Sequence, residues 1–156
     1  MKILLAEDDL HKSEQIRKLT IAILPTAELF EARSFRSSVR SLRSRAFDLV
    51  LLDMSMPAFD ITDDEDGGRH DPYAGREVLS EMERFRIFVP VIVITQFDRF
   101  GSGERATTLE DPDSMLRSKF PRNYSGYVFF DAMTETGEMP LRVQILSVGP
   151  IGAQSP

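Results

Sequence analysis

A chain of 156 residues has room for one compact domain with a single hydrophobic core. Its 42% hydrophobic and 28% charged residues exclude an intrinsically disordered protein, and its net charge of −6 disfavours nucleic-acid binding by bulk electrostatics. The sequence has no cysteine, which excludes disulfides and thiolate metal sites and suits a reducing cytoplasm. Because no apolar run approaches membrane-spanning length, we expect a cytoplasmic protein without a membrane partner.

The first part of the chain predicts strands that alternate with helices. Lys2 to Ala6 is a short apolar run that ends in acidic residues, which is typical of a buried parallel strand. Leu10 to Leu24 carries apolar residues at helical spacing, and Pro25 then stops the helix. A second strand is predicted over Ala27 to Ala32, and Ser34 can cap the next helix. The inner face of that helix is predicted to hold Val39, Leu42 and Ala46.

The same alternation continues to the end of the chain. The uninterrupted apolar runs Asp48 to Asp53 and Val89 to Thr95 indicate strands buried on both faces. Helical spacing predicts a helix over Gly75 to Phe85, and a fifth strand fits Gly126 to Phe130. Glu138 to Val148 has both helical spacing and a strand-like alternation, so its structure stays open between the two.

This pattern predicts an α/β fold with a doubly wound, five-stranded parallel sheet covered by helices on both faces. We expect one domain over residues 1–148, with a long acidic loop insert at 58–74 after the third strand, and a C-terminal tail at 149–156. Gln96 to Asp111 is a second polar loop. In such sheets the ligand site lies beyond the carboxyl ends of the strands.

Three acidic residues stand at the ends of two predicted strands. Glu7 and Asp8 follow the first strand, and Asp53 ends the third. If the two strands are neighbours, these carboxylates converge, and grouped carboxylates repel one another unless a cation compensates them. Mg²⁺ prefers oxygen ligands and binds few protein carboxylates together with a phosphate oxygen. The cluster therefore predicts Mg²⁺ as the cofactor and phosphoryl transfer as the chemistry.

Three sequence strings carry a resemblance to a known family. They are ILLAEDD at 3–9, FDLVLLDMSMP at 47–57 and PVIVIT at 90–95, and they occur in this order with Gly75 opening the following helix. Together they resemble the receiver domain of two-component response regulators, over about Met1 to Leu146. The resemblance implies the flavodoxin-like receiver fold and control by phosphorylation.

The resemblance also implies roles for individual residues. Asp53 looks like the phosphoacceptor, which takes a phosphoryl group from a phosphohistidine on a partner kinase. Asp8, Asp53 and the backbone carbonyl of Ser55 would bind Mg²⁺, while Glu7 would act mainly through a metal-bound water. Thr95 matches the hydroxyl that contacts the phosphoryl group.

The chain departs from the family at the end of the fifth strand. The family has a lysine there, three residues after an aromatic, and aligning Tyr127 with that aromatic puts Phe130 in the place of the lysine. Tyr127 itself is either a switch residue or plain core. Three cations in the preceding loop could reach the site, but such residues are more often ordinary surface charge. They are Arg117, Lys119 and Arg122.

The sequence therefore favours a stand-alone signalling receiver that is not an enzyme beyond its own phosphorylation and dephosphorylation. Its expected partners are a sensor histidine kinase or phosphotransfer protein and an unknown output protein, without direct contact to nucleic acid, and it is expected to be a monomer or homodimer. The alternative is a pseudo-receiver, a protein-interaction module that keeps the fold but no longer uses phosphate. The missing lysine and the acidic insert motivate this alternative.

Three other features receive a plain interpretation. The arginines between Arg33 and Arg45 are expected to form the solvated face of an amphipathic helix. The acidic insert does not match a calcium loop, because Thr62 stands where the first aspartate should be. His11 and His70 occur in contexts too different to suggest a metal-binding pair.

Overall fold

The computed structural model describes residues 1–62, 67–68, 70–96, 112–134 and 136–148. The five strands of the main sheet are β1 (Lys2–Ala6), β2 (Glu28–Ala32), β3 (Leu49–Asp53), β6 (Val91–Thr95) and β7 (Tyr124–Phe129). The helices are α1 (Leu10–Ile23), α2 (Phe35–Ser44), α3 (Ala74–Arg84), α4 (Pro112–Lys119) and α5 (Glu138–Val148). Two short strands, β4 (Met56–Pro57) and β5 (His70–Asp71), form a separate antiparallel pair.

The main sheet is parallel throughout, and its strand order is β2-β1-β3-β6-β7. Ala6 at the end of β1 pairs with Leu52 of β3, and Asp53 pairs with Ile94 of β6. The winding direction reverses between β1 and β3, because β2 lies outside β1 while β6 and β7 follow on the other side of β3. This is the doubly wound architecture that the sequence predicts, and its ligand site belongs at the carboxyl ends of β1 and β3.

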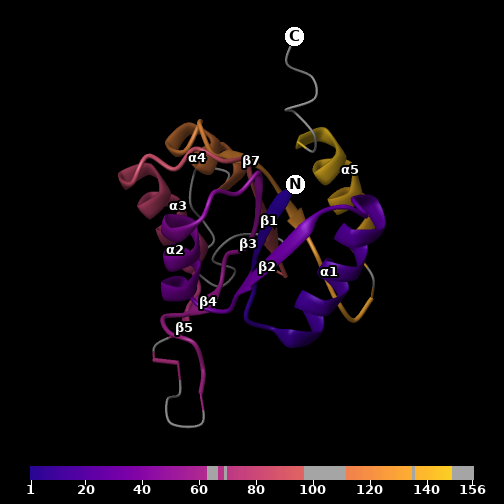
Figure 1. Cartoon of the computed structure of the whole chain (residues 1–156), viewed down its shortest axis with the longest axis horizontal. Helices are drawn as coiled ribbons and strands as arrows, with labels where there is room; N and C mark the ends of the chain where they lie inside the picture. The colour runs from indigo at the N-terminus through magenta and orange to yellow at the C-terminus, as the bar shows by residue number, and fades with distance from the viewer. Residues whose placement is uncertain (63–66, 69, 97–111, 135, 149–156) are drawn as a thin grey trace.

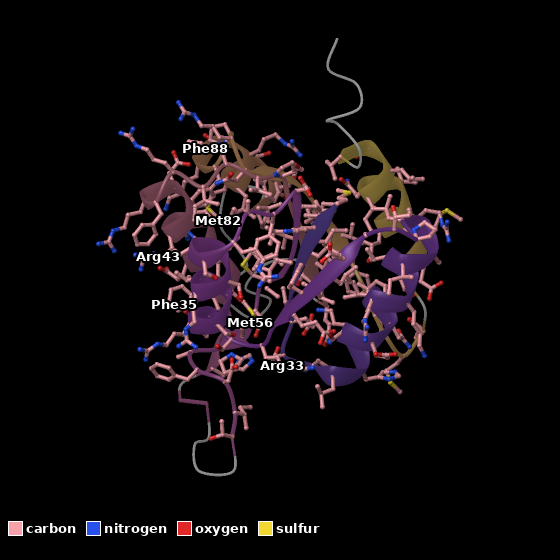
Figure 2. The ribbon with its side chains drawn as sticks, viewed as in Figure 1. Arg33, Phe35, Arg43, Met56, Met82 and Phe88 are labelled. Atoms are coloured by element: carbon pink, nitrogen blue, oxygen red, sulfur yellow. The ribbon has the colours of Figure 1, made fainter. Side chains whose placement is uncertain are left out.

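Two layers of helices cover the sheet. Helices α1 and α5 lie against one face, and α2, α3 and α4 lie against the other (Figure 1). One core cluster, on the α2 side, includes Leu4, Val50, Leu52, Val78 and Leu79. The other, on the α1 side, includes Ile3, Leu5, Leu51, Ile16 and Ile145. Met56 and Met82, both fully buried, fill the space between the sheet and the α2–α3 layer (Figure 2). Among the described residues, none of the helices has the length and hydropathy needed to cross a bilayer.

The elements expected from the sequence are present, with two corrections. Ala46 is exposed and not on the inner face of α2, because the helix ends at Ser44. Arg117 and Lys119 lie on helix α4 and not in the predicted loop, and Leu116 is the single buried residue of this helix. The ambiguous segment Glu138–Val148 is a helix, and Leu141 and Ile145 are its buried residues.

The chain between β3 and α3 carries the β4–β5 pair, which lies at the lower edge of the domain in Figure 1. Pro57 pairs with His70, so the residue just before the predicted insert lies against a residue within that insert. Residues 63–66 of the acidic insert, residues 97–111 of the second polar loop and the predicted tail at 149–156 lie outside the described residues. The predicted domain limits therefore stay a prediction.

Candidate functional site

Three carboxylates meet where β1 and β3 end. Glu7 and Asp8 directly follow β1, and Asp53 is the last residue of the neighbouring strand β3. One oxygen from each carboxylate lies within 4.8 Å of the others. Glu7 and Asp53 are buried, with 2% and 8% of their surface exposed, while Asp8 is partly open to solvent. The convergence expected from the sequence is thus present.

Local backbone contacts fix the positions of these side chains. Asp9 caps α1 by accepting a hydrogen bond from the Lys12 amide at 3.0 Å, and its own amide donates to Glu7 Oε1 at 3.1 Å. On the other side, the Gly75 amide at the start of α3 donates to the Met54 carbonyl at 2.9 Å. The two strand ends are therefore each tied to the first turn of a helix.

A buried lysine from α1 completes the cluster. The ammonium of Lys12 lies 2.7 Å from Glu7 Oε2 and 3.3 Å from Asp53 Oδ1, and its side chain has no exposed surface. Lys12 is in the first turn of α1, one turn before the buried Ile16. A lysine on the inward stripe of an otherwise amphipathic helix, just after an acidic strand end, is the sequence signal that could have identified it.

Burial and like charge govern the protonation of the acidic cluster. Desolvation, followed by the charge of Asp53, raises the pKa of Glu7 to about 9, although Lys12 opposes the shift. Desolvation and then Asp53 also raise the pKa of Asp8. Burial lowers the pKa of Lys12, but Asp53 and Glu7 together outweigh burial, so its net pKa is raised. Lys12 therefore remains an ammonium ion at neutral pH, whereas Glu7 holds a proton when no further cation is present.

The β4–β5 pair brings a histidine to the open side of the cluster. Nε2 of His70 lies 3.9 Å from Asp8 Oδ2, and Ser55 Oγ lies 3.3 Å from both ring nitrogens. The His70 side chain is more than half exposed. No local sequence pattern places His70 near the acids, because it lies within the predicted insert, 17 residues after Asp53 at the end of β3. His11, on the exposed side of α1, contacts Gln15.

Comparison with known proteins identifies the family. No family model matches the sequence. The chain is 31% identical over 137 residues to the Detocs response regulatory protein DtcB of Enterobacter cloacae, covering 86% of this chain and 91% of that protein. The chain belongs to the response-regulator family. This receiver is also 30% identical over 123 residues to the uncharacterised protein y4jR of Sinorhizobium fredii, covering 78% and 81% of the two chains.

Solved structures of receivers share the fold. The N-terminal domain of a response regulator/sensory box/GGDEF protein from Carboxydothermus hydrogenoformans aligns with a TM-score of 0.64 at 17% identity, over 99% of this chain and 98% of that one. The receiver domain of the sensor histidine kinase PA1611 from Pseudomonas aeruginosa aligns with a TM-score of 0.55 at 17% identity, over 95% and 97%. That structure has a magnesium ion coordinated in its active-site cleft. At these identities the likeness concerns the fold alone.

The donor set of this receiver fits a divalent cation. Its three carboxylates offer only oxygen ligands, which Mg²⁺ prefers, and the exposure of Asp8 leaves one side accessible to water ligands. One ammonium, that of Lys12, faces three carboxylates, so the cluster still lacks positive charge when all three are ionised. A divalent ion would supply it.

The remaining residues singled out from the sequence lie on β6 and β7. Thr95 is fully buried at the end of β6, one residue beyond the Asp53–Ile94 pair, and its carbonyl accepts a hydrogen bond from the Phe130 amide at 2.8 Å. Tyr127 is half-buried and packs against the core on the α2 side. Phe130, which the resemblance aligns with the lysine of the family, is fully buried in the opposite core cluster.

The three cations considered as replacements for that lysine are surface residues. Arg117 is exposed on α4 and forms an ion pair with Asp113 at 3.3 Å. Lys119 and Arg122 are also exposed. Lys119 lies over the ring of Phe120, and Arg122 lies over the ring of Phe88. None of the three forms an ion pair with the acidic cluster within the described residues.

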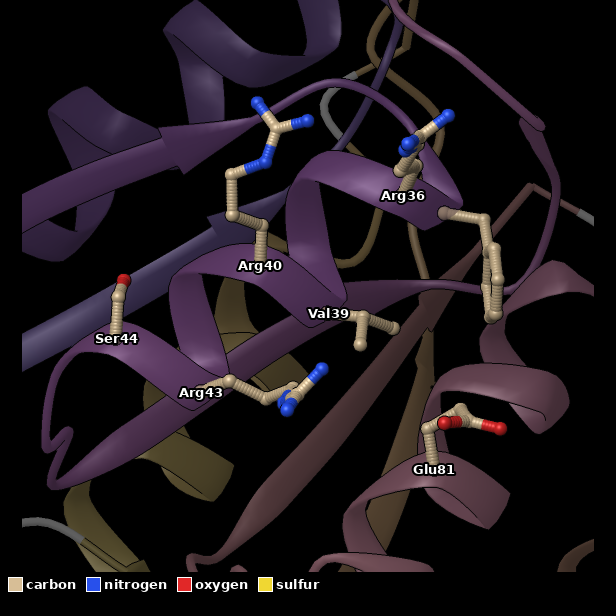
Figure 3. A pocket seen from close by; sticks show the side chains of 7 residues that line it. Arg36, Val39, Arg40, Arg43, Ser44 and Glu81 are labelled. Carbon is tan, nitrogen blue, oxygen red and sulfur yellow. The ribbon is translucent and has the colours of Figure 1, made fainter.

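The arginines of α2 line a separate groove between α2 and α3, with a volume of about 580 Å³. Arg36, Arg40 and Arg43 extend from successive turns of α2, and Glu81 lines the groove from α3 (Figure 3). All three arginines are exposed, as a solvated helix face requires. The groove contains none of the residues of the acidic cluster.

Proposed function

We propose that this receiver accepts a phosphoryl group on Asp53 from a histidine kinase or phosphotransfer protein, in a Mg²⁺-dependent reaction that changes binding to an output protein. The observation that carries the proposal is the meeting of the Glu7, Asp8 and Asp53 carboxylates within 4.8 Å at two neighbouring strand ends. The similarity to a response regulatory protein and the magnesium ion in the cleft of a receiver with the same fold support it.

The proposed reaction is a displacement at phosphorus by the Asp53 carboxylate. A carboxylate oxygen of Asp53 attacks the phosphorus atom, the bond from phosphorus to the donor imidazole breaks, and the leaving nitrogen takes up a proton. Asp8, Asp53 and the carbonyl of Ser55 are the proposed metal ligands, with Glu7 acting through a water molecule. When bound, Mg²⁺ supplies positive charge to the phosphoryl oxygens. The hydroxyl of Thr95 is proposed to contact the phosphoryl group.

Under this proposal the protein is a signalling component that modifies only itself. Its direct partners are proteins: the phosphoryl donor and the output protein whose binding the phosphate changes. A cytoplasmic location and a monomeric or homodimeric state are part of the same proposal.

The test uses acetyl phosphate as donor and intact mass as readout. Wild-type protein with Mg²⁺ is expected to gain one phosphoryl group, and Asp53→Asn is expected to gain none, because an amide is not a nucleophile of comparable strength. Asp48→Asn is the matched control, since Asp48 is an exposed aspartate immediately before the same strand. Equal phosphorylation of wild type and Asp53→Asn would contradict the proposal.

One observation favours the alternative function of a pseudo-receiver that binds partners without phosphate. The ammonium of Lys12 already contacts Glu7 and Asp53, and an internal cation can take the place of a metal as counter-ion. A titration with Mg²⁺ followed by amide chemical shifts separates the two functions. A saturable change at Glu7, Asp8 and Asp53 favours phosphoryl transfer, whereas a module that relies on Lys12 alone shows no such change.

A further inference from the structure

Phosphoryl transfer to Asp53 develops negative charge on the transferred group, and positively charged side chains aimed at that group stabilise it. The end of β7 supplies no such charge, because Phe130 is buried there in the hydrophobic cluster beneath α1 and α5. Any cationic contact from this chain to the phosphoryl group must therefore come from another element.

Helix α1 provides a cation in contact with the phosphoacceptor. Among the described residues, Lys12 is the one basic side chain that forms an ion pair with Asp53, with Nζ 3.3 Å from Oδ1. The same ammonium contacts Glu7 at 2.7 Å. The side chain is completely buried, so the ammonium is not free to move out into solvent. A cation held in this way is preorganised for charge that develops at Asp53.

The position of Lys12 is fixed by the backbone as well as by its ion pairs. The Asp9 side chain accepts a hydrogen bond from the Lys12 amide, which sets the first turn of α1 relative to the end of β1. Ile16, one turn later, is fully buried against the sheet and keeps this face of the helix turned inward. The helix N-terminus adds a positive dipole at the same place.

We propose that Lys12 supplies, from α1, the positive charge that contacts the phosphoryl group on Asp53. This inference rests on the proposed function and deepens it, because it places the cation that contacts the phosphoryl group on α1 and not at the end of β7.

The decisive experiment compares Lys12→Met with Lys18→Met, an exposed lysine on the same helix. Phosphorylation of each variant by acetyl phosphate with Mg²⁺ is followed by intact mass, and beryllofluoride binding is measured separately. Lys12→Met is expected to lower the phosphorylation rate about tenfold or more and to weaken beryllofluoride binding, because one charged contact to the transferred group is lost. Mg²⁺ affinity should not fall, because Lys12→Met removes a positive charge that would repel the metal ion. Lys18→Met should match wild type.

A second measurement uses the wild-type protein, so its result does not depend on whether Lys12→Met folds. The side-chain nitrogen resonance of Lys12 is expected to shift when beryllofluoride is added with Mg²⁺ to wild type, and not when it is added to Asp53→Asn. The Lys18 resonance should stay in place in both.

The outcomes separate this inference from the proposed function. If wild type is phosphorylated on Asp53 while the Lys12 resonance does not move, or while folded Lys12→Met reacts at the wild-type rate, Lys12 is only a structural counter-ion and the inference is wrong. If wild type is not phosphorylated on Asp53 at all, both the proposed function and the inference fail.

Discussion

Gly75 lies directly against the backbone of Asp53. A Cβ atom at Gly75 would be 2.7 Å from the Asp53 carbonyl oxygen and 2.9 Å from the Cα atom of Met54. Both contacts are to backbone, which cannot rotate away as a flexible side chain can. The first turn of α3 therefore approaches the end of β3 as closely as it does only because residue 75 has no side chain.

We therefore expect Gly75→Ala to displace the end of β3 and with it the Asp53 carboxylate. The free energy of unfolding should fall by about 1–3 kcal/mol, as for overpacking in a tight core, and Mg²⁺ affinity should fall because the three carboxylates no longer meet. Chemical denaturation and Mg²⁺ titration measure the two effects. Ala74→Gly, at the adjacent buried position, is a control that introduces no clash. Wild-type Mg²⁺ affinity in Gly75→Ala would show that the close approach does not position the site.

The raised pKa of Glu7 should make the stability of the metal-free protein depend on pH. Desolvation, with Asp53 as the second cause, raises the pKa of Glu7 from 4.5 to about 9, so the folded metal-free protein binds a proton that the unfolded chain releases. This contribution to stability is fully present below pH 4.5 and is lost as the pH rises through about 9. The metal-free protein should therefore become less stable as the pH rises across this interval.

The same proton should be released when a metal binds. Because Mg²⁺ favours the ionised carboxylate, its affinity should increase with pH up to about 9, the folded-state pKa of Glu7. Calorimetry at neutral pH in buffers with different ionisation enthalpies measures the protons released. Glu7→Gln should abolish most of this release, because it removes the carboxyl group that carries the proton. A Mg²⁺ affinity that does not change with pH would contradict the prediction.

The cap on α1 can be tested apart from the charges of the site. Asp9→Ala removes the acceptor for the Lys12 amide and should lower the free energy of unfolding by about 0.5–2 kcal/mol, whereas Asp9→Ser keeps a capping oxygen and should recover most of it. Urea denaturation of the two variants gives the comparison. Equal stability of Asp9→Ala and wild type would mean that the first turn of α1 does not depend on this cap.

The fold and the acidic cluster could be predicted because they rest on local patterns. Uninterrupted apolar runs such as Leu49–Asp53 identify buried strands, and parallel strands bring their terminal residues to the same edge. This logic leads from Glu7 and Asp53 to a shared site. Helix α4 was missed because Leu116 is its single buried residue, which leaves too little periodicity to recognise.

The parts of the site that were missed depend on packing between distant segments. His70 lies near Asp8 because β5, within the predicted insert, pairs with β4, and no local pattern predicts that pairing. Lys12 was overlooked because a lysine in a helix is normally exposed, and the burial of this one is explained only by the two carboxylates that surround its ammonium.

Removal of Lys12 should reveal how much of the repulsion between the acids it offsets. Breaking a buried ion pair by deleting one partner typically destabilises a protein by about 3–5 kcal/mol, because the other charge stays buried without compensation. In EDTA, Lys12→Met should therefore have a markedly lower free energy of unfolding than wild type. The loss should be smaller at pH values where Glu7 is protonated and carries no charge. A divalent ion compensates the same carboxylates, so Mg²⁺ should stabilise Lys12→Met more than it stabilises wild type.

Urea denaturation of both proteins and of Lys18→Met, with EDTA or with Mg²⁺, measures these differences. If Mg²⁺ stabilises Lys12→Met no more than wild type, the ammonium and the metal do not compensate the same charges.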